Sequence, residues 1–96
     1  MKQAWIYIMS NKIRTTFYIG VTSDLQSRVY QHRHSVLPGF TSKYKCFDLV
    51  YYEHFWGIEQ AIKREKQLKN WHREWKINLI KEINSDMKAL AVGWFD

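Results

Sequence analysis

Alternating side-chain types near the start of the chain predict a β-hairpin. Residues 4–9 and 16–22 are rich in β-branched and aromatic side chains, and the polar stretch 10–15 separates them. Residues 47–55 show similar alternation and aromatic content, so they predict a third strand.

The segment after the hairpin predicts a helix followed by a loop. Ser23 or Asp24 can cap the first turn of this helix, and apolar positions recur at helical spacing up to about residue 33. Pro38-Gly39 ends the helix, and we expect a loop over residues 35–46.

Helical periodicity dominates the C-terminal half. Apolar positions in residues 58–70 follow the i, i+3, i+4, i+7 pattern of an amphipathic helix, and residues 71–83 predict a third helix or a bent continuation. The order is therefore β-β-α-β-α-α, an α/β (α+β) arrangement. We expect one domain over residues 1–85 and a partly ordered tail over residues 86–96.

Length and composition limit the class of protein. A chain of 96 residues with 46% hydrophobic and 25% charged side chains is long enough for one globular domain. No run approaches the roughly 18 apolar residues of a membrane span, so we expect no membrane partner. The single cysteine, Cys46, allows no internal disulfide, which favours a reducing, cytoplasmic setting. The 15 Lys and Arg against 9 Asp and Glu give a net charge of +6, which favours a polyanionic partner such as nucleic acid.

One face of the predicted hairpin is unusually aromatic. If Ile6 pairs with Ile19, then Tyr7 and Tyr18 share the opposite face with Trp5, because side chains alternate along each strand. One interpretation is that helices cover both faces and the tyrosines are core residues. The other is a site in which a phenol orients or deprotonates a water.

Arg28 and His32 are four residues apart and therefore share a face of the first helix, beside Leu25 and Val29. An arginine offers a planar fork of donors that suits a phosphate, and a histidine exchanges protons near neutral pH. A solvated helix edge is the alternative interpretation.

Glu65 lies in the apolar stripe of the second predicted helix, between Ile62 and Leu68. A desolvated carboxylate needs a partner, because burying an unpaired charge costs several kcal/mol or more. A salt bridge to Arg28 or Arg64 would satisfy it. The alternative is Mg²⁺, which proteins often hold through one carboxylate and several waters.

Two tryptophans near the third helix, Trp71 and Trp75, are in phase with Leu79 and are expected in the core. Alternatively they form a basic aromatic surface with neighbouring cations. The candidate nucleic-acid contacts are Lys43, Lys69, Arg73 and Lys76.

The ordered set of motifs is similar to a known family. Trp5-Ile6-Tyr7, Tyr18-Ile19-Gly20, Arg28 with His32, and Glu65 resemble the GIY-YIG nuclease superfamily. Within it the chain resembles the small stand-alone bacterial proteins of the UPF0213 group, which are often described as endonucleases. The resemblance covers most of the chain.

The resemblance implies a small sandwich in which helices flank a three-stranded antiparallel sheet. It also implies DNA phosphodiester hydrolysis with one Mg²⁺ or Mn²⁺ ion per site, and a link to DNA repair by family association only. Carried over to this sequence, Glu65 would anchor the metal and Arg28 would hold the scissile phosphate. Tyr7 would act as general base or orient the water, Tyr18 would assist at the phosphate or the water, and His32 would relay the proton.

This sequence departs from the family pattern at two places. Trp5 stands where the motif has glycine, and the asparagine that many members carry after the glutamate has only Asn70 and Asn78 as candidates. Many members also carry a separate DNA-binding domain, for which these 96 residues leave no room. We therefore expect low sequence specificity, or specificity supplied by a partner protein or a dimer.

Three functions follow as hypotheses. The first is a metal-dependent DNA endonuclease, with RNA as an alternative substrate. The second is a nucleic-acid-binding module of the same fold with negligible hydrolysis. The third is an interaction domain that self-associates through Trp94 and Phe95.

Overall fold

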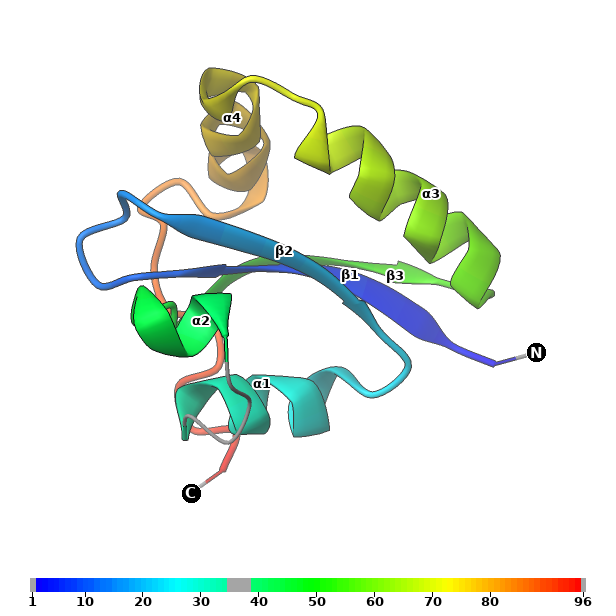
Figure 1. Ribbon diagram of the computed structural model, residues 1–96, viewed down its shortest axis with the longest axis horizontal. Coiled ribbons are helices and arrows are strands. Elements are labelled where there is room, and N and C mark those ends of the chain that lie inside the picture. Colours follow the sequence, from blue (N-terminus) through cyan, green and yellow to red (C-terminus); the bar gives the residue numbers. More distant parts are fainter. Residues whose placement is uncertain (1, 35–38, 96) are drawn as a thin grey trace.

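The central element is a three-stranded antiparallel sheet. The computed structural model describes residues 2–34 and 39–95. Strand β1 (Ala4–Ser10) lies in the middle, between β2 (Phe17–Thr22) and β3 (Asp48–Phe55) (Figure 1). The three predicted strands and the antiparallel sheet are therefore confirmed.

The register of the hairpin differs from the predicted one by two residues. Ile19 pairs with Ile8, not Ile6, and Tyr7 pairs with Gly20. The turn that joins the two strands spans residues 11–16. The side-chain oxygen of Asn11 stabilises this turn, because it accepts hydrogen bonds from the backbone N–H groups at positions 15 and 16. A shift of two leaves every side chain on its predicted face, since the pleat repeats every two residues.

Three of the helices follow the sequence pattern closely. Helix α1 (Leu25–Arg33) begins at Asp24, whose carboxylate accepts from the Ser27 N–H at 3.2 Å. Residues 58–83 form two helices, α3 (Ile58–Lys69) and α4 (Arg73–Ile83), rather than one bent helix.

The predicted loop over residues 35–46 is wrong in part. A short helix, α2 (Phe40–Lys43), forms within it after Gly39, which adopts a φ of 111° that favours glycine. Pro38 lies outside the described residues.

Helices cover both faces of the sheet. Helices α3 and α4 lie on one face, and α1 and α2 lie on the other (Figure 1). Ile6 and Ile8 pack toward α3 and α4 with Leu68, whereas Tyr7 and Val29 belong to the core on the α1 side. The expected α+β sandwich is confirmed.

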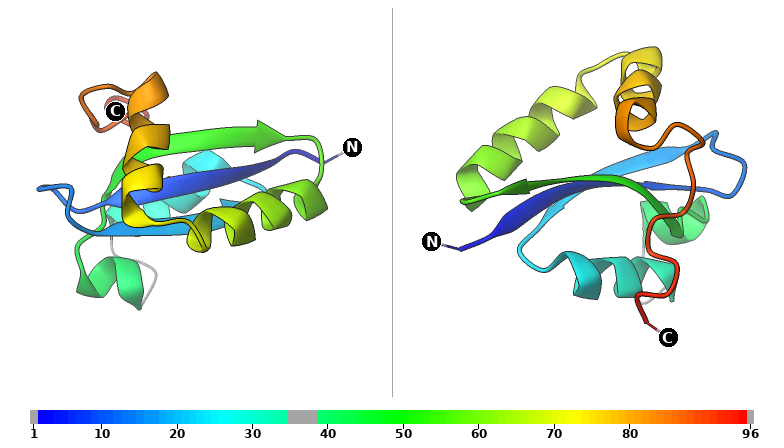
Figure 2. Two further views of the ribbon diagram at one scale, coloured as in Figure 1. Left: turned by 90° about the horizontal axis from the view of Figure 1, so that it is seen from above. Right: turned by 180° about the vertical axis from the view of Figure 1, so that it is seen from behind.

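The segment after α4 packs along the outer edge of β3. The Asn84 side-chain amide donates to the Val50 carbonyl at 3.0 Å, and the Leu90 N–H donates to the Leu49 carbonyl at 2.8 Å. Figure 2 shows this segment, coloured orange to red, leaving α4, passing beside β3 and ending near α1.

The aromatic residues of this segment contact their own chain. Trp94 meets Tyr52 with ring centroids 6.2 Å apart, and Phe95 meets Tyr30 at 5.3 Å. Both side chains are half-buried. Across the described residues, none of the helices has the length and apolar character to cross a bilayer.

Candidate active site

A buried chain of three polar side chains links the sheet to α1 and α2. Tyr7 of β1 is fully buried, and its hydroxyl oxygen lies 2.9 Å from His32 Nε2 in a hydrogen bond. On the other side of the imidazole, His32 Nδ1 lies 2.9 Å from the hydroxyl oxygen of Thr41. One ring nitrogen of a neutral histidine donates and the other accepts, so the imidazole can pass a proton between its two partners.

Burial keeps both ring systems neutral near pH 7. Desolvation, helped by the hydroxyl of Tyr18, raises the pKa of Tyr7 well above its usual value, while the guanidinium of Arg28 acts in the opposite direction. Desolvation and the charge of Arg28 lower the pKa of His32 to about 4. His32 is therefore neutral at neutral pH, with a lone pair on one ring nitrogen, and the lowered pKa makes it a weaker base than a free histidine.

Gly20 makes room for the Tyr7 ring. A Cβ atom at this position would lie 2.4 Å from both Cζ and the hydroxyl oxygen of Tyr7, well inside van der Waals contact. Gly20 had no role predicted from the sequence. A signal was present, because a glycine inside a strand often marks close approach of another group.

Thr41 is the second residue that the sequence analysis missed. It is buried and holds the far nitrogen of His32 from the short helix α2. No sequence signal distinguished it, since a single threonine in a predicted loop is common.

Tyr18 lies between the buried chain and the surface. Its ring centroid is 6.2 Å from that of Tyr7 and 5.4 Å from that of His32, as expected for residues on one face of the sheet. It also lines a surface groove of about 220 Å³ at β2, with Phe17, Ile19, Phe40, Lys69 and Lys76. The groove thus brings Tyr18 together with two lysines, Lys69 of α3 and Lys76 of α4.

Glu65 lies on α3 one turn before Lys69, and Lys69, not Glu65, lines the groove. Its carboxylate is largely buried and lies 3.5 Å from the Lys69 ammonium, one helical turn away. The predicted partners were wrong: Arg64 pairs with Glu53 of β3 at 2.9 Å, and the ion pair of Glu65 is with Lys69.

The donor set suits one hard cation. Among residues 2–34 and 39–95, no group of three or more His, Cys, Asp or Glu side chains comes together around a metal position. A single carboxylate beside a solvent-accessible groove fits Mg²⁺, which keeps several waters and takes further oxygens from substrate phosphates. Lys69 would have to move away from Glu65 to admit the ion.

The predicted nucleic-acid contacts divide by position. Lys69 and Lys76 line the groove, and the guanidinium of Arg73 lies 5.3 Å from the centroid of the Phe17 ring at its margin. Lys43 lies over the Tyr44 ring at 5.4 Å, at the end of α2.

The two tryptophans near α4 differ in exposure. Trp71 is half-buried and lies 5.3 Å from the Arg64 guanidinium. Trp75 is 53% exposed, so its expected place in the core was wrong.

Trp5 and the two asparagines lie outside the groove. The Trp5 ring packs edge-on against His54 of β3, with centroids 5.2 Å apart, because its partner on that strand is His54. Asn70 caps the C-terminal end of α3, and Asn78 lines a separate cavity with Trp75.

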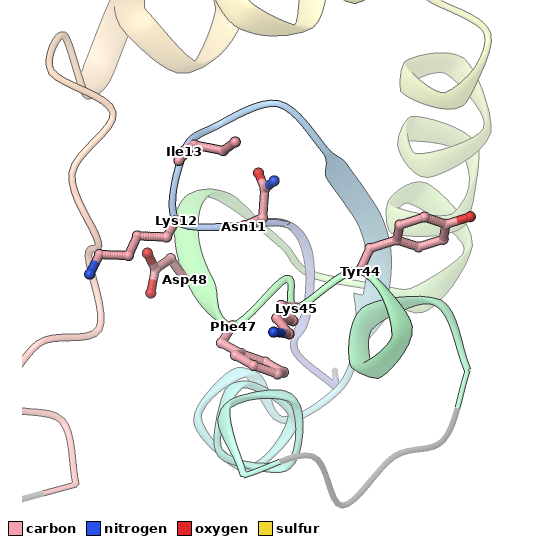
Figure 3. A pocket seen from close by; sticks show the side chains of 7 residues that line it. All are labelled: Asn11, Lys12, Ile13, Tyr44, Lys45, Phe47 and Asp48. Atoms are coloured by element: carbon pink, nitrogen blue, oxygen red, sulfur yellow. The ribbon is translucent and has the colours of Figure 1, made fainter.

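A different cavity of about 490 Å³ lies between the β1–β2 turn and the connection from α2 to β3 (Figure 3). Asn11, Ile13, Tyr44 and Phe47 are among its lining residues. None of the five predicted catalytic residues lines it, so it has no part in the candidate site.

Comparisons with known proteins agree with the motifs. Residues 3–78 match the family described as the GIY-YIG catalytic domain. A UPF0213 protein from Staphylococcus saprophyticus is 32% identical over 82 residues, which cover 85% of this chain and 99% of that protein. A UPF0213 protein from Staphylococcus aureus strain Mu50 is 33% identical over 67 residues, covering 70% of this chain and 82% of the relative.

The fold also resembles a solved structure. The solution NMR structure of a UPF0213 protein from Bacillus halodurans superimposes with a TM-score of 0.58 at 23% identity. The similarity covers 95% of this chain and 97% of that one. At this identity the likeness supports the fold alone.

Proposed function

The chain belongs to the GIY-YIG family, within the small UPF0213 group, and on this premise we propose that it is a metal-dependent endonuclease that hydrolyses DNA phosphodiester bonds. Family membership indicates a nuclease-type domain that acts on nucleic acid and generally uses a divalent metal ion. The observation that carries the proposal is the buried Tyr7–His32–Thr41 chain, which lies behind a groove lined by cations.

The first role concerns the proton of the attacking water. Tyr7 accepts this proton as its own hydroxyl proton passes to the Nε2 atom of His32. The low pKa of His32, about 4, keeps that nitrogen free at neutral pH. Thr41 accepts from the Nδ1–H of the same ring, which leaves Nε2 as the acceptor.

The second role concerns the charge of the phosphate. Arg28 holds the scissile phosphate through its planar fork of donors, close enough to Tyr7 and His32 to influence the pKa of both. Tyr18 orients the phosphate or the water at the mouth of the groove. Glu65 would hold one Mg²⁺ or Mn²⁺ ion, and a bound ion would supply positive charge to offset the charge that develops on the phosphodiester.

The composition of the groove supports low sequence specificity. Lys69 and Lys76 suit backbone phosphates, which carry no sequence information directly. The described lining contains no amide or carboxylate, the groups that recognise adenine and cytosine edges. Specificity beyond this would come from a partner protein or a dimer.

The direct test is a nicking time course on supercoiled plasmid in Mg²⁺, in Mn²⁺ and in EDTA. Wild type is compared with Glu65→Gln and Arg28→Ala, and Glu59→Gln is the matched control because Glu59 is exposed on the same helix. We expect cleavage only with metal, a loss of at least 100-fold in the first two variants, and wild-type rates in the control. Equal cleavage by all four proteins would contradict the proposal. Binding without cleavage would replace it with the binding-module hypothesis.

A further inference from the structure

The groove beside Tyr18 has two chemically different walls. Lys69 of α3 and Lys76 of α4 supply ammonium groups on the side of α3 and α4, where Phe17 and Ile19 also line the groove. Tyr18 of β2 and Phe40 of α2 supply aromatic rings on the other. A ligand that fills this groove must therefore present negative charge to one wall and a flat apolar face to the other.

The aromatic wall continues outward along α2. The centroid of the Phe40 ring is 5.9 Å from that of Tyr18 and 4.6 Å from that of Tyr44. Phe40 and Tyr44 are 44% and 45% exposed, so neither ring is needed to fill the core. In Figure 3 the Tyr44 ring extends from the end of α2 away from the other labelled side chains.

This run of exposed rings needs a specific explanation. The same short helix buries Thr41 against His32, so α2 is fixed in place while Phe40 stays exposed at the groove. A rigid aromatic side chain held at the edge of a cationic groove is the usual arrangement for stacking a base while cations contact the backbone.

We propose that this groove binds an unpaired nucleotide of single-stranded DNA, with its base stacked on Phe40 and its phosphates along Lys69 and Lys76. In a duplex the neighbouring base pairs stack on both faces of each base, so no base face is available to Phe40. The proposal rests on the proposed nuclease function and adds a preference for single-stranded over duplex substrate. The net charge of +6 and the lysine wall favour a polyanion over an apolar protein partner.

The test measures binding in EDTA, so that it does not depend on cleavage. Fluorescence anisotropy compares a labelled 12-nucleotide dT strand, a duplex of the same length, and a strand of abasic residues with the same phosphates. The proteins are wild type, Phe40→Ala and Phe40→Tyr, with Tyr30→Ala as matched control. Tyr30 is an exposed aromatic residue of α1 that does not line the groove.

We expect Phe40→Ala to weaken binding of the dT strand by about 10-fold, within the roughly 5- to 150-fold range that loss of one stacking ring produces. Phe40→Tyr and Tyr30→Ala retain wild-type affinity for the dT strand. The abasic strand and the duplex bind more weakly than the dT strand and are unaffected by Phe40→Ala. Equal losses for the dT and abasic strands, or no loss for either, would overturn the proposal.

Failure of this proposal is distinguishable from failure of the nuclease assignment. A protein that nicks plasmid with metal but binds all three probes equally in EDTA would keep the proposed function and refute the stacking role of Phe40. A protein that shows the predicted probe dependence without cleavage would keep the stacking role and refute catalysis.

Discussion

Protonation of the buried His32 is expected to make the stability of the fold depend on pH. The ring lies between Tyr7 and Thr41 with 3% of its surface exposed, and burial with the charge of Arg28 lowers its pKa from 6.5 to about 4. In the unfolded chain the same ring has its ordinary pKa. Between pH 6.5 and pH 4 the unfolded state therefore binds one more proton than the folded state, so stability falls as the pH falls.

The size of this effect follows from the difference in pKa. Each pKa unit corresponds to 1.36 kcal/mol, so at pH 4.5 the contribution of His32 to the free energy of unfolding is about 2–3 kcal/mol lower than at pH 7.5. Above pH 6.5 the ring is neutral in both states, and the contribution is constant. The carboxylates also titrate in this range, which makes a comparison with a variant necessary.

His32→Gln provides that comparison, because glutamine keeps hydrogen-bonding atoms at the site but does not titrate. Urea unfolding of both proteins, followed by tryptophan fluorescence, gives the free energy of unfolding at pH 7.5 and pH 4.5. We expect the stability advantage of wild type to shrink by about 2–3 kcal/mol between these two values. An advantage that does not change with pH would refute the reasoning that His32 is held neutral.

Three further predictions concern residues around the same site. Gly20→Ala forces a Cβ atom onto the Tyr7 ring, so urea unfolding is expected to show a loss of about 1–3 kcal/mol. Thr41→Val leaves a ring nitrogen of His32 without its partner, so the same assay is expected to show a loss of about 1–3 kcal/mol in the free energy of unfolding. Thr41→Ser keeps a hydroxyl and should largely restore this stability. Equal losses for both variants would show that the hydroxyl is unimportant. Lys76→Ala removes one groove cation, so the slope of log K against log salt for DNA binding should fall by about 1, and an unchanged slope would place the DNA elsewhere.

Local periodicity predicted the face on which each main site residue lies. Tyr7 and Tyr18 share a face because strand side chains alternate, and this survived an error of two residues in the register. His32 points toward the sheet because it lies four residues after Arg28 and three after Val29 on an amphipathic turn.

The contacts that depend on distant segments could not be predicted in this way. Gly20 meets Tyr7 only in the actual register, and Thr41 meets His32 only because an unpredicted helical turn forms at α2. The ion pair between Glu65 and Lys69 is different, because i, i+4 neighbours on one helix meet without help from the rest of the fold and the spacing alone could have predicted it. Helical phase placed Trp75 beside Leu79 but could not show that its ring is half exposed.

The central claim is that Tyr7, backed by His32, removes the proton of the attacking water. The measurement that tests it most directly is the single-turnover cleavage rate of a labelled single strand by wild type and Tyr7→Phe, with affinity for the uncut strand measured in EDTA. Phenylalanine fills the same buried space but has no hydroxyl to bond to His32. We predict that the variant binds like wild type and cleaves at least 100-fold more slowly, as expected for loss of a general base. Cleavage by Tyr7→Phe at the wild-type rate would contradict the account.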